Sequence, residues 1–337
     1  MHNPLPRRRF VGISAAAAGM ALLPLAASGS SDNAVAPSPH LRIWRGIALG
    51  ADAMLQIHHP DSAEADRLIA RSVAEVRRLE RVFSLYRGDS ALSALNRQGT
   101  LDDPPTDLLR LLGESRQASR LTDGAFDPTV QPLWNLYAGH FAQAGADPRG
   151  PSDAARAAAV ALVDYRKVEI GEGSIRLAAG GMALTLNGIA QGYITDRVAE
   201  LLLSSGVERA LVDMGENRVL GDRPDGTPWR VGIRDPRLPD GIAETIELRS
   251  AAISTSGGYG TEFDPAGRFN HIFDPKTGLT SRRYLSVSVI APQATTADAL
   301  STAFSLLPLD RTAAIVRQLG IKAHFILPDG SRLVQTA

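Results

Sequence analysis

One carboxylate and one hydroxyl at helical spacing are the residues best suited to chemistry. The segment Ala294-Thr-Thr-Ala-Asp-Ala-Leu-Ser-Thr302 carries Asp298 and Thr302 at positions i and i+4, so on a helix both oxygens lie on one face. Such a pair suits a hard cation such as Mg²⁺, which prefers oxygen ligands and keeps waters that a phosphate can replace. The alternative is a capping box, in which Thr295 caps the helix and Asp298 is its partner. Spacing alone leaves both open.

Three other segments could complete a site. His271 and Asp274 precede a Pro–Thr–Gly turn, where the histidine could act as a general base or bind an anion, and Asp274 could equally bond its own backbone. Gly188 and Gly192 flank a predicted helix start, which allows close backbone approach and offers free N–H groups to a phosphate. Helix packing explains the two glycines equally well. The stretch 123–130 predicts a turn that carries one aromatic residue and one carboxylate.

These side chains must be positioned by a mixture of helices and strands. Apolar periodicity and caps predict helices from the Asp61-x-x-Glu64 pattern to Phe83, from Pro105 to near Gly124, and over about 152–163, 188–205, 296–307 and 310–318. Strands are expected within 41–58 and at 167–170, 174–177, 183–186, 210–213, 229–233, 245–248, 285–290, 323–327 and 332–335. Asp225-Gly226 and Asp329-Gly330 predict hairpin-type turns. Because strands and helices do not alternate strictly, we expect an α+β fold of mixed or antiparallel sheets packed with helices, rather than a doubly wound one.

Composition excludes several classes of function. The chain has 337 residues, with 36 Lys+Arg against 36 Asp+Glu, so its net charge of zero argues against a nucleic-acid partner. It contains no cysteine, which excludes disulfides, thiolate nucleophiles, Cys-ligated zinc and iron–sulfur clusters. No G-x-G-x-x-G, Walker A or G-x-S-x-G element supports a nucleotide-binding fold or a serine hydrolase.

The first 30 residues predict an export signal. Arg7-Arg-Arg9 precede Phe10-Val11 and an apolar stretch over 12–27, and Arg-Arg-x-Phe-Val resembles the twin-arginine signal. The apolar run is short of the roughly 20 residues that a membrane span needs, so the mature protein is expected to have no transmembrane span. We therefore expect a signal peptide at 1–30, a linker at 31–40, one catalytic unit at 41–337, and a periplasmic location.

Taken in order, a series of short motifs resembles the ApbE family of FAD:protein FMN transferases over about residues 45–325. The matching stretches are Phe83-Ser-Leu-Tyr86, Ser90-x-Leu-Ser-x-Leu-Asn96, Gly124-Ala-Phe-Asp-Pro-Thr-Val130, Gly188-Ile-Ala-Gln-Gly-Tyr193 with Asp196, Val212-x-Met-Gly215, Trp229-Arg-Val-Gly-Ile233 with Asp235-Pro236, Ser254-Thr-Ser-Gly257, His271-Ile-Phe-Asp-Pro-Lys-Thr-Gly278 and Ala297-Asp-Ala-Leu-Ser-Thr302. Each motif is weak singly, and their order carries the resemblance.

The resemblance implies a T-fold-related unit that binds FAD, cleaves its pyrophosphate with Mg²⁺ and moves FMN onto a Ser or Thr hydroxyl of a client protein, releasing AMP. The implied FAD-binding residues are Leu49, Tyr86, Ala125, Phe126, Asp127, Thr185, Gln191 and Ile272. The implied metal ligands are Asp298, Thr302 and the backbone carbonyl of Gly188. His271 and Asp298 are the implied catalytic residues, with His271 or a metal-bound carboxylate as the base for the client hydroxyl.

The chain departs from the family pattern in three segments. Leu49-Gly50-Ala51 stands where the family usually has Met-Gly-Thr, Thr185 where it often has Asp, and Gln191 where it usually has Lys or Glu. Threonine and glutamine can still hydrogen-bond FAD, but the lost charges could alter affinity or rate. Two alternatives therefore stay open, a non-catalytic FAD-binding or FAD-donating maturation factor and a Mg²⁺-dependent FAD pyrophosphatase.

The start of the mature chain points to a subgroup of the family. The Trp44-Arg-Gly-x-Ala-Leu-Gly50 segment, together with the twin-arginine leader and the stretch 185–193, resembles the subgroup associated with nitrous oxide reductase maturation. The client that this subgroup implies is a membrane-bound flavoprotein regulator of nitrous oxide reduction.

Overall fold

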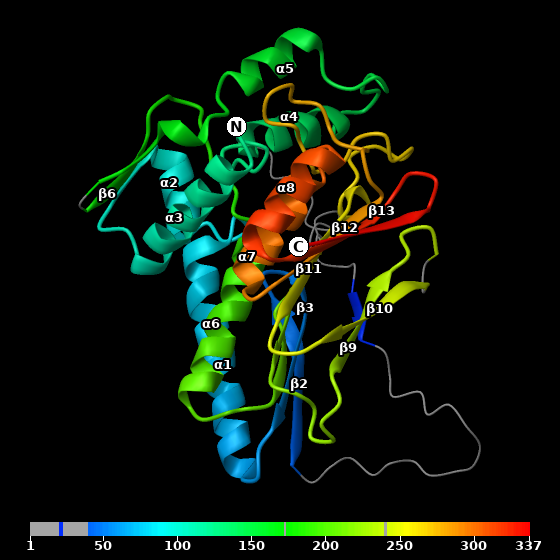
Figure 1. Ribbon diagram of the computed structural model, residues 1–337. Coiled ribbons are helices and arrows are strands. Elements are labelled where there is room, and N and C mark those ends of the chain that lie inside the picture. Colours follow the sequence, from blue (N-terminus) through cyan, green and yellow to red (C-terminus); the bar gives the residue numbers. More distant parts are fainter. Residues whose placement is uncertain (1–19, 23–39, 172, 239–240) are drawn as a thin grey trace.

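The computed structural model describes residues 20–22, 40–171, 173–238 and 241–337 (Figure 1). The predicted signal peptide and linker lie outside these residues, except for 20–22 and residue 40. Within the described part of the chain, no helix is long and apolar enough to cross a bilayer.

An eight-stranded sheet, in which every neighbouring pair is antiparallel, forms the centre of the fold. Its strands, in spatial order, are β14 (Arg332–Thr336), β13 (Lys322–Ile326), β12 (Ser286–Ala291), β11 (Ala252–Ser256), β8 (Asn217–Leu220), β7 (Ala210–Asp213), β3 (Ala51–His58) and β2 (Leu41–Ala48). This arrangement confirms the expected α+β class. It also places the turn between β7 and β8 beside the end of β11, although β11 lies more than 30 residues later in the sequence.

Helices cover one face of this sheet. The long helix α1 (Ser62–Phe83) lies beside α6 (Ala190–Ser204), and α6 packs against α7 (Ala294–Phe304), which lies on β11 and β12 (Figure 1). Asp61 caps α1 by accepting hydrogen bonds from the N–H groups of Ala63 and Glu64, at 2.8 and 3.1 Å, as the capping pattern predicts. The helix then buries the stripe that faces the sheet, which consists of Ala65, Leu68, Ser72, Val76, Leu79, Val82 and Phe83.

A small three-stranded sheet packs against the other face. It joins β1 (Met20–Leu22), β9 (Trp229–Arg234) and β10 (Ile242–Leu248), again antiparallel. Val231 and Ile233 of β9 join Met54 and Leu211 of the main sheet in a separate apolar cluster. Both faces of the central strands are therefore buried.

Smaller elements complete the fold. They are α2 (Ala91–Gln98), α3 (Thr106–Leu121), α4 (Gln131–Phe141), α5 (Asp153–Val160), α8 (Leu309–Leu319) and a third sheet of β4 (Thr100–Asp102), β6 (Ser174–Leu177) and β5 (Val168–Ile170). Tyr137 of α4 contacts the rings of Phe263, Phe269 and Phe273, which fastens α4 to the loop after β11.

Two local predictions are wrong. Residues 183–186 form no strand, because the backbone N–H and carbonyl of Leu184 bond instead to the side-chain amide of Asn96, at 2.7 and 2.8 Å. The Asp225-Gly226 turn joins β8 to β9, which belong to different sheets, so it is no hairpin. The Asp329-Gly330 hairpin between β13 and β14 is confirmed.

Candidate active site

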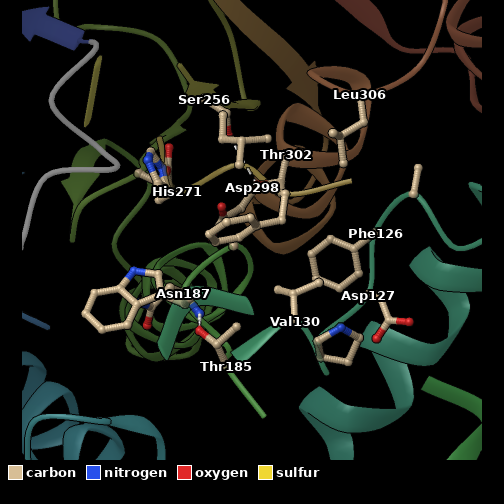
Figure 2. Close-up of a pocket in the computed structure, with 17 residues that line it drawn as sticks. Phe126, Asp127, Val130, Thr185, Asn187, Ser256, His271, Asp298, Thr302 and Leu306 are labelled. Atoms are coloured by element: carbon tan, nitrogen blue, oxygen red, sulfur yellow. Dashed lines mark hydrogen bonds between the residues drawn. The ribbon is translucent and has the colours of Figure 1, made fainter. Parts of the chain in front are cut away.

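One pocket gathers most of the predicted site residues where α6, α7 and several loops meet (Figure 2). It is lined by Ala125, Phe126, Asp127, Pro128, Val130, Trp134, Thr185, Asn187, Gly188, Glu216, Ser256, His271, Ile272, Phe273, Asp298, Thr302 and Leu306. In the view of Figure 2, Asp298 and Thr302 lie between His271 and Ser256 on one side and Phe126 and Val130 on the other. The predicted residues Leu49, Tyr86 and Gln191 do not line it.

Asp298 and Thr302 face the pocket from successive turns of α7. The capping-box alternative is wrong, because α7 begins after Gln293 and Thr295 lies inside the helix. The N-terminus of α7 is instead capped by Asp196 of α6, which accepts hydrogen bonds from the backbone N–H groups of Ala294 and Thr295, at 2.9 and 2.8 Å. The carboxylate of Asp298 is therefore not used as a cap of its own helix.

The two glycines expected to permit close approach do so. A Cβ on Gly192 would lie 2.3 Å from the carbonyl oxygen of Ala294 and 2.8 Å from the Cβ of Asp298. A Cβ on Gly188 would lie 2.9 Å from the hydroxyl oxygen of Thr302. The first turn of α6 thus lies directly against α7, and the Gly192 N–H donates to Asp298 Oδ2 at 3.0 Å.

Two buried carboxyl groups meet at the base of the pocket without a cationic partner. Asp298 and Glu216 are 3% and 2% exposed. Burial raises the pKa of Asp298 to about 7, while burial and the neighbouring Asp298 raise the pKa of Glu216 well above its ordinary value. Arg218 pairs with Asp196 at 2.6 Å, and among the described residues no Lys or Arg pairs with Asp298 or Glu216.

The oxygen atoms at this end of the pocket are of the types that a divalent cation such as Mg²⁺ prefers as ligands. Glu216 Oε2 is buried and has no hydrogen-bond partner among the described residues. Thr302 adds a hydroxyl, and the Gly188 backbone lies against it. In the described part of the chain no three His, Asp or Glu side chains form a metal-binding group. A cation here would therefore depend on the Asp298 carboxylate supplemented by hydroxyl and carbonyl oxygens.

His271 is held with one ring nitrogen occupied. Its Nδ1 lies 3.3 Å from the carbonyl oxygen of Thr261, and because a carbonyl only accepts, Nδ1–H is the donor. Burial lowers the pKa of the imidazole, so the neutral form is favoured and Nε2 is left as an acceptor. Asp274 instead accepts from Lys276 N–H and the Thr277 hydroxyl, so it bonds within its own turn, as the alternative held.

The loop that carries Phe126 is braced by Asp127. The carboxylate of Asp127 accepts from the backbone N–H of Thr129 at 2.8 Å, from the Thr129 hydroxyl at 2.6 Å and from the N–H of Tyr165 at 3.0 Å. Burial raises the pKa of this carboxyl group. With both oxygens engaged, Asp127 orders the loop, and the ring of Phe126 and the side chain of Val130 form its apolar wall.

Three predicted FAD-binding residues, Tyr86, Leu49 and Gln191, lie outside the lining of the pocket. Tyr86 lies at the rim, 55% exposed, with its side chain hydrogen-bonded to that of Asn187. Leu49 lies in the turn between β2 and β3, where its N–H donates to Glu80. The side chain of Gln191 packs on Gly215, where a Cβ would lie 2.4 Å from its Nε2.

The pocket includes residues that sequence reasoning did not assign, chiefly Glu216, Ser256, Asn187 and Trp134. Glu216 directly follows the Val212-x-Met-Gly215 motif, and Ser256 belongs to the Ser254-Thr-Ser-Gly257 motif. Both motifs therefore marked the region of the pocket, but neither spacing nor composition indicated what Glu216 or Ser256 does there.

Comparisons with known proteins find relatives of this chain in both sequence and structure. Residues 49–325 match the ApbE family. An FAD:protein FMN transferase of Treponema pallidum is 33% identical over 293 residues, which cover 80% of this chain and 79% of the relative. The structure is similar to that of the ApbE protein of Thermotoga maritima (TM-score 0.78, 29% identity, 88% of this chain and 97% of the other). The flavin transferase ApbE of Vibrio cholerae gives a TM-score of 0.75 at 28% identity, with the same coverage.

Proposed function

Because this chain belongs to the ApbE family, we propose how its pocket carries out the activity of an FAD:protein FMN transferase. The chain flavinylates client proteins with FAD as substrate. The observation that carries the proposal is the meeting of Asp298, Thr302 and His271 in one pocket.

Mg²⁺ is the cation that this set of oxygens suits. Asp298, the Thr302 hydroxyl and the Gly188 carbonyl would hold it, since buried carboxylates without a basic partner call for a positive charge. When bound, Mg²⁺ supplies charge stabilisation at the pyrophosphate of FAD. The remaining work of the chain is to orient the substrate and to receive a proton.

The acceptor is a Ser or Thr hydroxyl of the client. Its oxygen forms a bond to the phosphorus of the FMN half of FAD, and the bond from that phosphorus to the bridging oxygen breaks, so AMP leaves with that oxygen. The hydroxyl proton passes to Nε2 of His271, which the Thr261 carbonyl orients through Nδ1. The apolar wall formed by Phe126 and Val130 suits the flavin ring.

One incubation separates the transferase from the two alternatives. Purified protein is mixed with FAD, Mg²⁺ and a client domain, and the products are separated by chromatography and mass spectrometry. We expect covalent FMN on the client together with an equal amount of AMP. A pyrophosphatase would release free FMN and AMP without any client, and a non-catalytic maturation factor would bind FAD and release no AMP.

The place of action and the client extend the proposal. The twin-arginine pattern at Arg7-Arg8 supports export to the periplasm, and the Trp44–Gly50 segment supports the nitrous oxide reductase subgroup. The client is then a membrane-bound flavoprotein regulator of nitrous oxide reduction. Failure of such a regulator's periplasmic domain to accept FMN, while a known transferase of the subgroup labels it, would refute the subgroup assignment.

A further inference from the structure

Glu216 lines the pocket but has no role in the transfer as described so far. Its side chain comes from the turn between β7 and β8 and lies near Asp298. We propose that Glu216 supplies a second carboxylate ligand to the divalent cation held by Asp298 and Thr302. The inference rests on the Mg²⁺ site proposed above and adds a ligand that comes from a different element.

The turn that carries Glu216 is fixed on several sides. Gly215 adopts a φ of 101°, a conformation that favours glycine, and its N–H donates to Asp213 Oδ1 at 3.1 Å. The backbone carbonyl of Glu216 accepts from the Thr195 hydroxyl of α6 at 3.0 Å. With its backbone tied to α6, the Glu216 side chain has little freedom to leave the pocket.

The surroundings of the carboxylate leave one oxygen for a ligand. The side chain of Ser254 and the backbone of Thr255 hydrogen-bond to the carboxyl group. Oε2 has no partner among the described residues although it is buried. A buried polar atom without a partner destabilises the fold, so its persistence beside a second carboxylate calls for an explanation.

A cation explains the pair better than hydrogen bonding does. Two buried carboxylates repel one another, and Arg218, the nearby basic residue, is already paired with Asp196. A divalent cation between Asp298 and Glu216 would remove the repulsion and occupy Oε2. If Glu216 were purely structural, protonated and hydrogen-bonded, its replacement would not change the affinity for metal. Metal affinity therefore distinguishes a ligand role of Glu216 from a structural role.

The test measures metal binding rather than activity. Mn²⁺ is titrated into the full-length protein by electron paramagnetic resonance, with and without FAD, for wild type, Glu216→Gln and Asp298→Asn. Glu114→Gln is the matched control, because Glu114 is a half-buried glutamate on α3 outside this pocket. We expect Glu216→Gln to weaken Mn²⁺ binding by at least about tenfold. Removing a residue that only hydrogen-bonds to a metal ligand already lowers metal affinity by this much, and a direct ligand should matter at least as much. The control should bind as wild type does.

The outcomes are distinguishable. Unchanged Mn²⁺ affinity in folded Glu216→Gln, with weakened binding in Asp298→Asn, would overturn the role of Glu216 and leave the proposed metal site standing. Absence of Mn²⁺ binding to the wild type, with or without FAD, would refute the metal site itself. If Glu216→Gln fails to fold, wild type labelled with ¹³C-glutamate decides: a glutamate carboxylate infrared band must shift when Mg²⁺ is added, and no shift refutes the proposal.

Discussion

At the scale of single residues, the pocket depends on an acid that is buried without a counterion. Asp298 receives a hydrogen bond from the Gly192 N–H but no ion pair from the described basic residues. Its removal should therefore affect cation binding far more than the fold.

We predict that Asp298→Ala lowers Mg²⁺-dependent FMN transfer by more than about 100-fold, beyond the loss typical of outer-shell partners. The unsatisfied Gly192 N–H should cost only about 1–3 kcal/mol, so the variant should stay folded. Initial rates of client flavinylation, with circular dichroism as the check on folding, measure this. A variant that unfolds outright would show Asp298 to be chiefly structural.

The pH dependence of metal binding follows from the same group. Burial raises the pKa of Asp298 to about 7, so at pH 6 most of the metal-free protein carries a proton where the cation must bind. Binding must displace that proton, so Mg²⁺ affinity should increase from pH 6 to pH 8. Mn²⁺ titrations across this range measure the slope, and equal affinity at the two ends would contradict the prediction.

Replacement of His271 should affect the enzyme differently from replacement of Asp298, because His271 is proposed to accept a proton whereas Asp298 is proposed to bind the cation. We predict that His271→Gln lowers kcat by about 10²–10⁴-fold, the usual contribution of a general base, while FAD still binds. Single-turnover transfer and FAD fluorescence titration separate the two effects. A loss of FAD binding with an unchanged transfer rate would assign His271 to substrate binding instead.

At the scale of elements, the contact between α6 and α7 fixes the metal-binding end of the pocket. Asp196 of α6 caps α7 and pairs with Arg218 of β8, so a single side chain joins two helices to the sheet. The close approach at Gly192 leaves no room for a side chain.

We predict that Gly192→Ala destabilises the protein by about 1–3 kcal/mol, as overpacking does, and weakens metal binding because Asp298 is displaced. Gly113→Ala is the control, since Gly113 lies in α3 and a Cβ there would meet nothing within 4 Å. That control should gain up to about 1 kcal/mol from helix propensity. Urea unfolding measures both, and equal stability of the two variants would contradict the prediction.

The elements that were predictable are those with a local signal. The capped and periodic α1 and the helix carrying Asp298 follow from nearby residues alone. Strands β8 and β11 were missed, since short buried strands are defined by their long-range pairing. The error at 183–186 has the same origin, because Asn96 supplies the backbone partners from 88 positions away.

At the scale of the whole molecule, the site could be predicted only in part. The motifs placed Asp298, Thr302, Gly188 and His271, but the presence of Glu216 depends on β7, β8 and β11 being neighbours. No periodicity or spacing encodes that adjacency, and the unpartnered oxygen of Glu216 exists only in the folded chain.

The proposed export signal would act on the whole folded chain, since the twin-arginine route carries proteins already folded. We predict that the double substitution Arg7→Lys, Arg8→Lys retains folded, active protein in the cytoplasm, because the receptor reads the arginine pair. Cell fractionation with an activity assay measures this. Unchanged periplasmic activity of the double variant would exclude the twin-arginine route.

Two parts of the pocket have unequal tolerance to change. The part made by α7 and the strand ends is fixed by buried hydrogen bonds, whereas His271 and, across the pocket from it, Phe126 and Val130 lie on loops (Figure 2). Loops accept substitutions and insertions that packed helices do not. Directed evolution toward a new acceptor sequence or an altered flavin should therefore randomise the loop positions of 123–130 and 257–285 other than Asp127 and His271, and keep the cation-binding residues constant.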